Sequence, residues 1–113
     1  MDEARARELL QAERARIERA LRELHPHSDD ELAHADQHPA EEATELYEDE
    51  YEAGVAERLR NELEAVERAE ARLAEGKYGL SVESAEPIPD ERLEAIPTAE
   101  RTAAEQARFE RGR

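Results

Sequence analysis

The feature that most constrains the fold is a helical repeat that continues without a break over residues 40–75. Apolar residues recur there three or four positions apart along one side, as in an amphipathic helix. They are Leu46, Ala53, Ala56, Leu59, Leu63, Val66, Ala69 and Leu73. Such a helix is about 54 Å long at a rise of about 1.5 Å per residue, which is too long to be wrapped by a globule of this size. It therefore needs a partner helix.

The segment that can supply this partner is residues 2–24, which carries a narrow apolar stripe. The stripe consists of Leu10, Ile17, Leu21 and Leu24. Pro26 interrupts the pattern, a capping-box sequence at Ser28–Glu31 predicts a short helix through Gln37, and His38-Pro39 predicts a chain reversal. Because the reversal lies near the middle of residues 2–76, we expect an antiparallel coiled-coil hairpin over residues 1–76, with its tip near residues 36–43.

The pattern changes after Gly76, where prolines separate short apolar clusters. We expect residues 77–113 to form a compact C-terminal globule with a small core of Tyr78, Leu80, Val82, Ile88, Leu93 and Ile96. Leu80–Glu83 is a candidate short strand, and Thr98 is a candidate cap for a final helix that ends near Arg111. The sequence as a whole predicts an all-α protein in which a long hairpin carries this globule.

Composition narrows the classes of partner. Charged residues make up 42% of the chain and the net charge is −15, yet both signs are interspersed, as in long helices. The acidic excess argues against direct binding to nucleic acid or to anionic membranes, because binding phosphates requires cations. There is no cysteine, no apolar leader and no transmembrane run, so we expect a cytoplasmic protein.

The C-terminal region also contains three phrases in a distinctive order. Tyr78-Gly79 comes first, Pro87-Ile88-Pro89 follows, and a run from Arg92 to Ala99 completes the series. With the preceding helix, these phrases resemble the TraR/DksA family of bacterial proteins that bind RNA polymerase. The resemblance implies a coiled-coil hairpin on a small zinc-finger globule. It also implies a non-enzymatic regulator of transcription, whose tip enters the secondary channel and changes the stability of promoter complexes.

Members of that family usually carry two CxxC pairs that bind zinc. The resemblance places Ser81, Ser84, Thr102 and Glu105 at the four ligand positions. Three hydroxyls and one carboxylate do not supply the thiolates of a structural zinc site. We therefore expect a degenerate, zinc-free globule that needs no metal and no cofactor.

The family's hairpin tip depends on two aspartates and an alanine. Alignment without gaps places His38 at the first acidic position, Glu41 at the second and Ala43 at the alanine, with Asp36 near enough to replace the missing acid. The sign of the transcriptional effect stays open. Alternatively, Glu41 and Glu42 only stabilise the positive N-terminal end of the second helix.

The family also presents basic residues to guanosine tetraphosphate. The matching positions here are Ala65, Ile96 and Gln106, none of which is cationic. A polyphosphate needs charge-assisted donors, so we expect this nucleotide not to bind, unless Arg101 or Arg108 supplies the charge from the last helix.

Two other groups of residues allow more than one interpretation. All four histidines lie between His25 and His38 among several aspartates, so this segment is a solvated loop, a metal site or a pH sensor. Tyr47 and Tyr51 are one helical turn apart and either pack between the hairpin arms or contact a partner. The competing functions are a structural coiled coil that no longer binds polymerase and a Gre-like factor that stimulates transcript cleavage.

Overall fold

The computed structural model describes residues 1–24 and 42–112, with side chains described from residue 50 onward in the second part. The first helix, α1 (Glu3–Leu24), begins where the sequence predicts. Asp2 caps it, since its carboxylate accepts a hydrogen bond of 2.7 Å from the backbone N–H of Arg5. Ala6, Leu10 and Ile17 are buried on one face, at spacings of four and seven residues.

The second helix, α2 (Glu42–Ala74), follows the long repeat. Its buried residues are Ala56, Leu59, Val66 and Ala69, whereas Leu63 and Leu73 are half-buried and Ala53 is exposed. Gly76 ends the helix at φ +75°, a conformation that glycine adopts without strain. The backbone N–H of Lys77 then bonds to the carbonyl of Arg72 at 2.8 Å, and that of Gly76 bonds to Leu73 at 3.1 Å. These two bonds form a Schellman motif.

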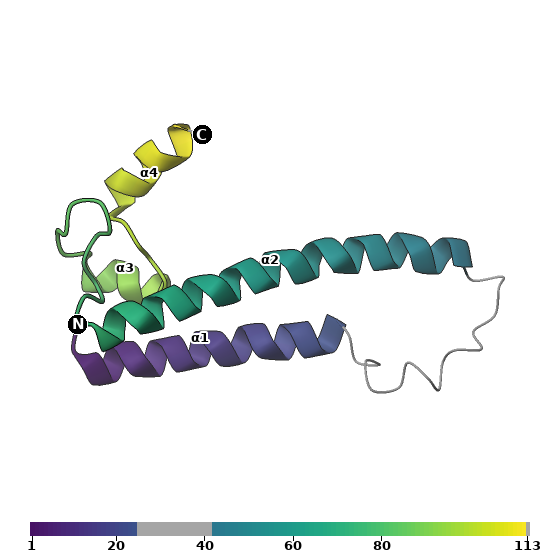
Figure 1. The fold of residues 1–113 in the computed structure, drawn as a ribbon, viewed down its shortest axis with the longest axis horizontal. Coiled ribbons are helices and arrows are strands. Elements are labelled where there is room, and N and C mark those ends of the chain that lie inside the picture. Colours follow the sequence, from purple (N-terminus) through teal and green to yellow (C-terminus); the bar gives the residue numbers. More distant parts are fainter. Residues whose placement is uncertain (25–41, 113) are drawn as a thin grey trace. The chain divides into compact units, whose positions relative to one another are not determined.

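The two helices form an antiparallel hairpin, as predicted (Figure 1). Ion pairs join the arms on either side of the apolar stripe. Arg14 of α1 contacts Glu70 of α2 at 2.7 Å, and Arg16 contacts Glu62 at 2.8 Å. The two ion pairs therefore add polar contacts between the arms beside a narrow apolar stripe.

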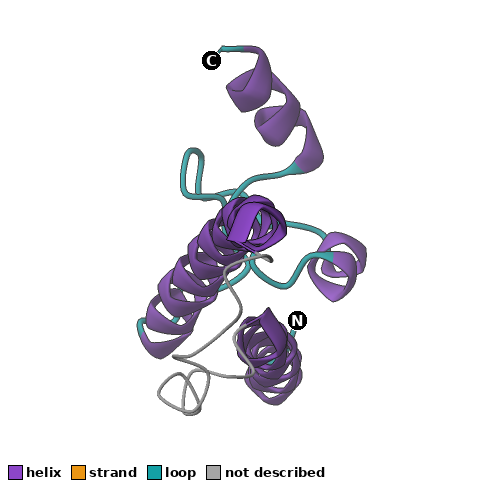
Figure 2. Cartoon of the chain, turned by 90° about the vertical axis from the view of Figure 1, so that its right-hand side faces the viewer, coloured by secondary structure: helices purple, strands orange, loops and turns teal. Residues whose placement is uncertain are grey.

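The C-terminal globule contains two short helices, α3 (Asp90–Ala95) and α4 (Ala103–Arg111), connected by loops (Figure 2). Ile88, Leu93 and Ala99 form its core, and Tyr78 packs against them. The Tyr78 hydroxyl donates a hydrogen bond of 2.7 Å to the carbonyl of Pro97. Gly79 lies at φ +83°, and a Cβ there would come within 3.4 Å of Leu93, so this close approach also favours glycine.

Three details of the globule differ from the sequence prediction. Within the described residues Leu80 makes one isolated antiparallel bridge, with Pro87, in place of a strand. Val82 and Ile96 are 49% and 43% exposed, so they do not join the core. The final helix is capped by Thr102, because only Thr102 has an acidic residue three positions later to complete a capping box.

The described residues divide into two compact units. One comprises Met1–Ala15 with Glu64–Arg113, and the other is Arg16–Leu63. The first unit therefore contains the whole globule together with the start of α1 and the end of α2. In the part of the chain that the structure describes, no helix has the length and apolar character needed to cross a membrane.

Candidate functional site

The four residues expected at ligand positions lie together in the globule. We call Ser81, Ser84, Thr102 and Glu105 the hydroxyl–carboxylate cluster. Ser81 and Glu105 are 4% and 5% exposed, the two buried polar residues of the described chain. A buried polar group is costly unless it is hydrogen-bonded, so the arrangement of partners decides whether this cluster is stabilising.

The first half of the cluster is a tight turn around Ser81. The Ser81 hydroxyl oxygen accepts hydrogen bonds from the backbone N–H of Glu83 at 3.0 Å and of Ser84 at 3.2 Å. The turn closes through the N–H of Ala85, which bonds to the Ser81 carbonyl at 2.9 Å, and Ala85 lies at φ +63°. Since Ser81 accepts two bonds, its single hydroxyl hydrogen stays available as a donor.

The second half of the cluster is the start of α4. The Thr102 hydroxyl accepts a bond of 3.2 Å from the N–H of Glu105, and the Glu105 carboxylate accepts one of 2.9 Å from the N–H of Thr102. This reciprocal pair is a complete capping box. It fixes the Glu105 carboxylate at the positive N-terminal end of the helix, where a negative charge is favourable.

The two halves meet at the Glu105 carboxylate. Hydrogen bonds from the Ser84 and Ser81 hydroxyls, then from the Thr102 backbone, lower the pKa of Glu105 to about 2. Donors to a carboxylate stabilise its charged form, which is the cause of this shift. The cluster thus joins residues 81–84 to residues 102–105 through one ionised, hydrogen-bonded side chain.

This donor set does not fit a structural zinc ion. It provides one carboxylate and three neutral hydroxyls, and the hydroxyl oxygens of Ser81 and Thr102 already accept backbone hydrogen bonds. Among the residues that the structure describes, no three His, Cys, Asp or Glu side chains come close enough to hold a metal ion. The cluster is therefore suited to joining two segments of the globule.

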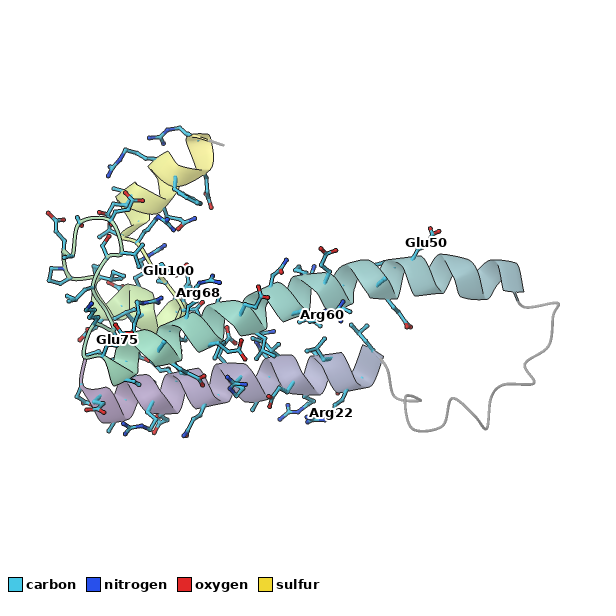
Figure 3. The ribbon with its side chains drawn as sticks, in the orientation of Figure 1. Arg22, Glu50, Arg60, Arg68, Glu75 and Glu100 are labelled. Carbon is cyan, nitrogen blue, oxygen red and sulfur yellow. The ribbon has the colours of Figure 1, made fainter. Side chains whose placement is uncertain are left out.

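Ion pairs link the globule to both hairpin arms within the first unit. Glu100 accepts from Arg72 at 3.1 Å and from Arg68 at 3.2 Å, and Figure 3 shows Arg68 and Glu100 side by side. On the other arm, Arg5 of α1 holds Glu94 of α3 through two bonds of 2.8 and 2.6 Å. The hydrogen bond from Arg5 lowers the pKa of Glu94.

Sequence reasoning did not find these links, because each joins residues far apart in the chain. It also missed the position of Arg101, whose guanidinium lies 3.8 Å from the centre of the Phe109 ring and 2.6 Å from Glu83. Spacing within a helix predicts pairs three or four residues apart. It carries no information on partners that only the fold brings together.

The other candidate residues are accounted for as follows. Asp36, His38 and Glu41 lie outside the described residues, as do all four histidines, and only the backbone of Ala43, in α2, is described. Tyr51 is 69% exposed, so of its two interpretations the one in which it packs between the hairpin arms is wrong. The three neutral positions of the nucleotide prediction differ in exposure: Ala65 and Gln106 are half-buried and Ile96 is exposed.

The chain is similar to known proteins both in sequence and in structure. No family model matches the chain. Over 69 residues it is 42% identical to the uncharacterized protein YteA of Bacillus subtilis, which is 61% of this chain but only 29% of that relative's length. Among solved structures, the transcription factor DksA2 from Pseudomonas aeruginosa matches with a TM-score of 0.82 and 26% identity, over 96% of this chain and 83% of that one.

Proposed function

Because the chain is a DksA-like, all-helical protein without cysteines, we propose that it binds RNA polymerase through the secondary channel and regulates transcription without metal. The observation that carries this proposal is the match to a transcription factor along nearly the whole chain, hairpin and globule together. A likeness limited to the coiled coil would support only a generic helical hairpin. The globule is the part that distinguishes a channel-binding factor from other hairpins.

In this proposal the hairpin serves as a stiff arm and performs no chemistry. The ion pairs Arg14–Glu70 and Arg16–Glu62 and the buried apolar stripe support an ordered pair of helices. Asp36, His38, Glu41 and Ala43 are the proposed tip residues. They act by favouring one state of the polymerase over another, which requires contacts that differ between the two states.

We further propose that the hydroxyl–carboxylate cluster occupies the place of the family's zinc ion. A structural zinc ion contributes on the order of 10 kcal/mol in small modules, and it does so by joining two loops. Glu105 joins the same kind of loops here through hydrogen bonds from Ser81, Ser84 and Thr102. A globule built this way has no ligand thiolate to oxidise, so its activity is independent of zinc supply and of thiol oxidation.

The test is competition with a known secondary-channel factor for core RNA polymerase. We expect this protein to displace a fluorescent secondary-channel factor and to change the lifetime of promoter complexes. Glu41→Ala or Ala43→Trp should abolish the effect on transcription with little change in displacement of the factor. The control Glu64→Gln, which removes the charge of an exposed glutamate in α2, should change neither.

Three results would contradict parts of this proposal. Failure to displace the factor would favour a structural coiled coil that has left the polymerase. Stimulated cleavage of backtracked RNA would favour a Gre-like activity. Parallel loss of binding and activity in the tip variants would remove the division between a docking base and an acting tip.

A further inference from the structure

Gly54 lies in the interior of the long helix α2, and the described residues give no steric reason for a glycine there. Gly76 and Gly79 have positive φ angles, which favour glycine, whereas Gly54 has the backbone of an ordinary helical residue. A Cβ at Gly54 would meet no heavy atom within 4 Å apart from the backbone of its own helix. Glycine is a poor helix former, because it loses much conformational freedom on becoming helical. At this position it therefore weakens α2 without any gain in packing.

Gly54 also lies near the place where α1 stops supporting α2. The ion pairs that join the two arms set the register of the hairpin, and counting onward from them places Leu24, the last residue of α1, opposite residues 54–60 of α2. The ribbon of α2 continues past this point (Figure 1). The first residues of α2 therefore extend beyond the end of α1.

Burial along α2 changes at the same place. Ala56 and Leu59 are buried, whereas none of the described side chains of residues 50–55 is. Most of the stability of a protein helix comes from the packing of its apolar face. The packed section that begins at Ala56 is therefore stiff, and the weakest helix former stands directly before it.

We propose that Gly54 is a hinge in α2 that sets the direction of the segment leading to the hairpin tip. Bending at this residue breaks few contacts, because the hinge lies at the edge of the packed section. The inference rests on the proposed function, in which the packed section is the stiff arm and the tip favours one state of the polymerase. A hinge lets the tip follow the polymerase as it changes between its states. Gly54 is thus a positioning residue that acts through the tip.

A glycine on an exposed helix surface can instead allow the backbone of a partner to approach closely. The two roles have different requirements. A hinge needs a weak point at about this place in the helix, whereas close approach needs the missing Cβ at position 54 itself. The neighbouring residue Ala53 is also exposed. The double variant Gly54→Ala/Ala53→Gly moves the glycine by one residue and turns it about 100° around the helix axis, so it separates the two roles.

The first measurement is amide exchange in the free protein. In the wild type we expect residues 50–57 to exchange faster than residues 59–66. In Gly54→Ala the exchange of residues 50–57 should slow roughly fivefold, the ratio that corresponds to the difference in helix propensity between glycine and alanine. The matched control is Asn61→Ala, which improves helix propensity at an exposed position of the packed section and should leave residues 50–57 unchanged. Equal exchange in the wild type and Gly54→Ala would refute the hinge.

The second measurement compares displacement of a fluorescent secondary-channel factor with the change in promoter-complex lifetime. We expect Gly54→Ala to displace the factor as the wild type does, because the packed section and the globule are unchanged. Its effect on promoter-complex lifetime should fall by up to roughly fivefold, as the bent form becomes less populated. Gly54→Ala/Ala53→Gly and Asn61→Ala should both keep the wild-type effect.

The outcomes separate this inference from the function on which it rests. Failure of the wild type to displace the factor would refute the proposed function and with it the role of the hinge, while amide exchange still tests the hinge itself. Normal displacement with a full effect of Gly54→Ala on transcription would refute the positioning role alone. Loss of the effect in both glycine variants would show that the missing Cβ is required for contact, and loss in Asn61→Ala would show that only the overall stability of the helix matters. Either of these two results would contradict the proposal.

Discussion

Glu100 is the residue whose removal should most weaken the attachment of the globule to α2. Its carboxylate faces two arginines of α2, and its backbone carbonyl accepts a bond of 2.8 Å from the N–H of Val82. The substitution Glu100→Gln keeps this backbone bond and the size of the side chain. It removes the negative charge and replaces one acceptor oxygen with an amide donor beside the two arginines, so the change in stability reports on the ion pairs.

The expected magnitude follows from the burial of the two pairs. The Arg72 side chain is 14% exposed and that of Glu100 is 23% exposed, whereas Arg68 is 53% exposed. Among the contacts within the described chain, Nε and Nη2 of Arg72 have no hydrogen-bond partner, so Glu100 is the group that balances this guanidinium. Removing one partner of a buried pair costs about 3–5 kcal/mol and of an exposed pair about 0–1 kcal/mol. For this partly buried site we expect a loss of about 2 kcal/mol.

Urea and thermal unfolding followed by circular dichroism measure this loss, which corresponds to a fall in Tm of about 8 °C for a chain of this size. Glu64→Gln is the matched control, because it makes the same chemical change at an exposed position of α2. Double-mutant cycles should assign more of the coupling to Arg72 than to Arg68. If Glu100→Gln and its control differ by less than about 0.5 kcal/mol, the ion pairs do not hold the globule and the reasoning is wrong.

Three further predictions concern the cluster and the ligands. The pKa of Glu105 is depressed in the folded state, so its contribution to stability is complete above the usual carboxyl pKa of 4.5 and is lost as pH falls toward 2. In Glu105→Gln, the free energy of unfolding should therefore fall less steeply between these two pH values. Chelators should leave Tm unchanged and elemental analysis should find no stoichiometric zinc, whereas a variant with cysteine at all four cluster positions should bind Co²⁺ with the absorption of a tetrahedral thiolate site. Guanosine tetraphosphate should not alter the effect of this protein on in vitro transcription when the polymerase's own nucleotide site is disabled. Synergy between the nucleotide and this protein that Arg101→Gln or Arg108→Gln removes would show that these arginines rebuild the site.

The hairpin could be predicted from sequence because its determinants are local. The apolar repeat and the stop at Gly76 each act within one or two turns of helix. The globule was less predictable, because its few apolar residues follow no period. Val82 and Ile96 have the same apolar character as Ile88 and Leu93, and only the packing decides that the first two are exposed.

The candidate site was likewise predictable only in part. The resemblance to a zinc module selected four residues distant in sequence, and these residues do lie together. Their chemistry was not predictable from residue types alone. Serine, threonine and glutamate residues would ordinarily be assigned to a solvated surface. Only the fold shows that Ser81 and Glu105 are buried and that the Glu105 carboxylate accepts hydrogen bonds from both halves of the cluster.

Contacts between charged groups explain how the globule is held together although its apolar core is small. Ile88, Leu93 and Ala99 bury little apolar area, so ordering the surrounding loops needs further favourable contacts. Charged groups supply them at three places: Arg5 holds α3, Glu100 holds the loop before α4, and Glu105 joins the two turns of the cluster. Each of these links is shielded from water to a different degree. Salt should therefore weaken the exposed Arg5–Glu94 pair first and the buried Glu105 cluster last. Amide exchange measured at rising salt should show α3 losing protection before the first turn of α4, and simultaneous loss would mean that the globule is held as one unit by its apolar core.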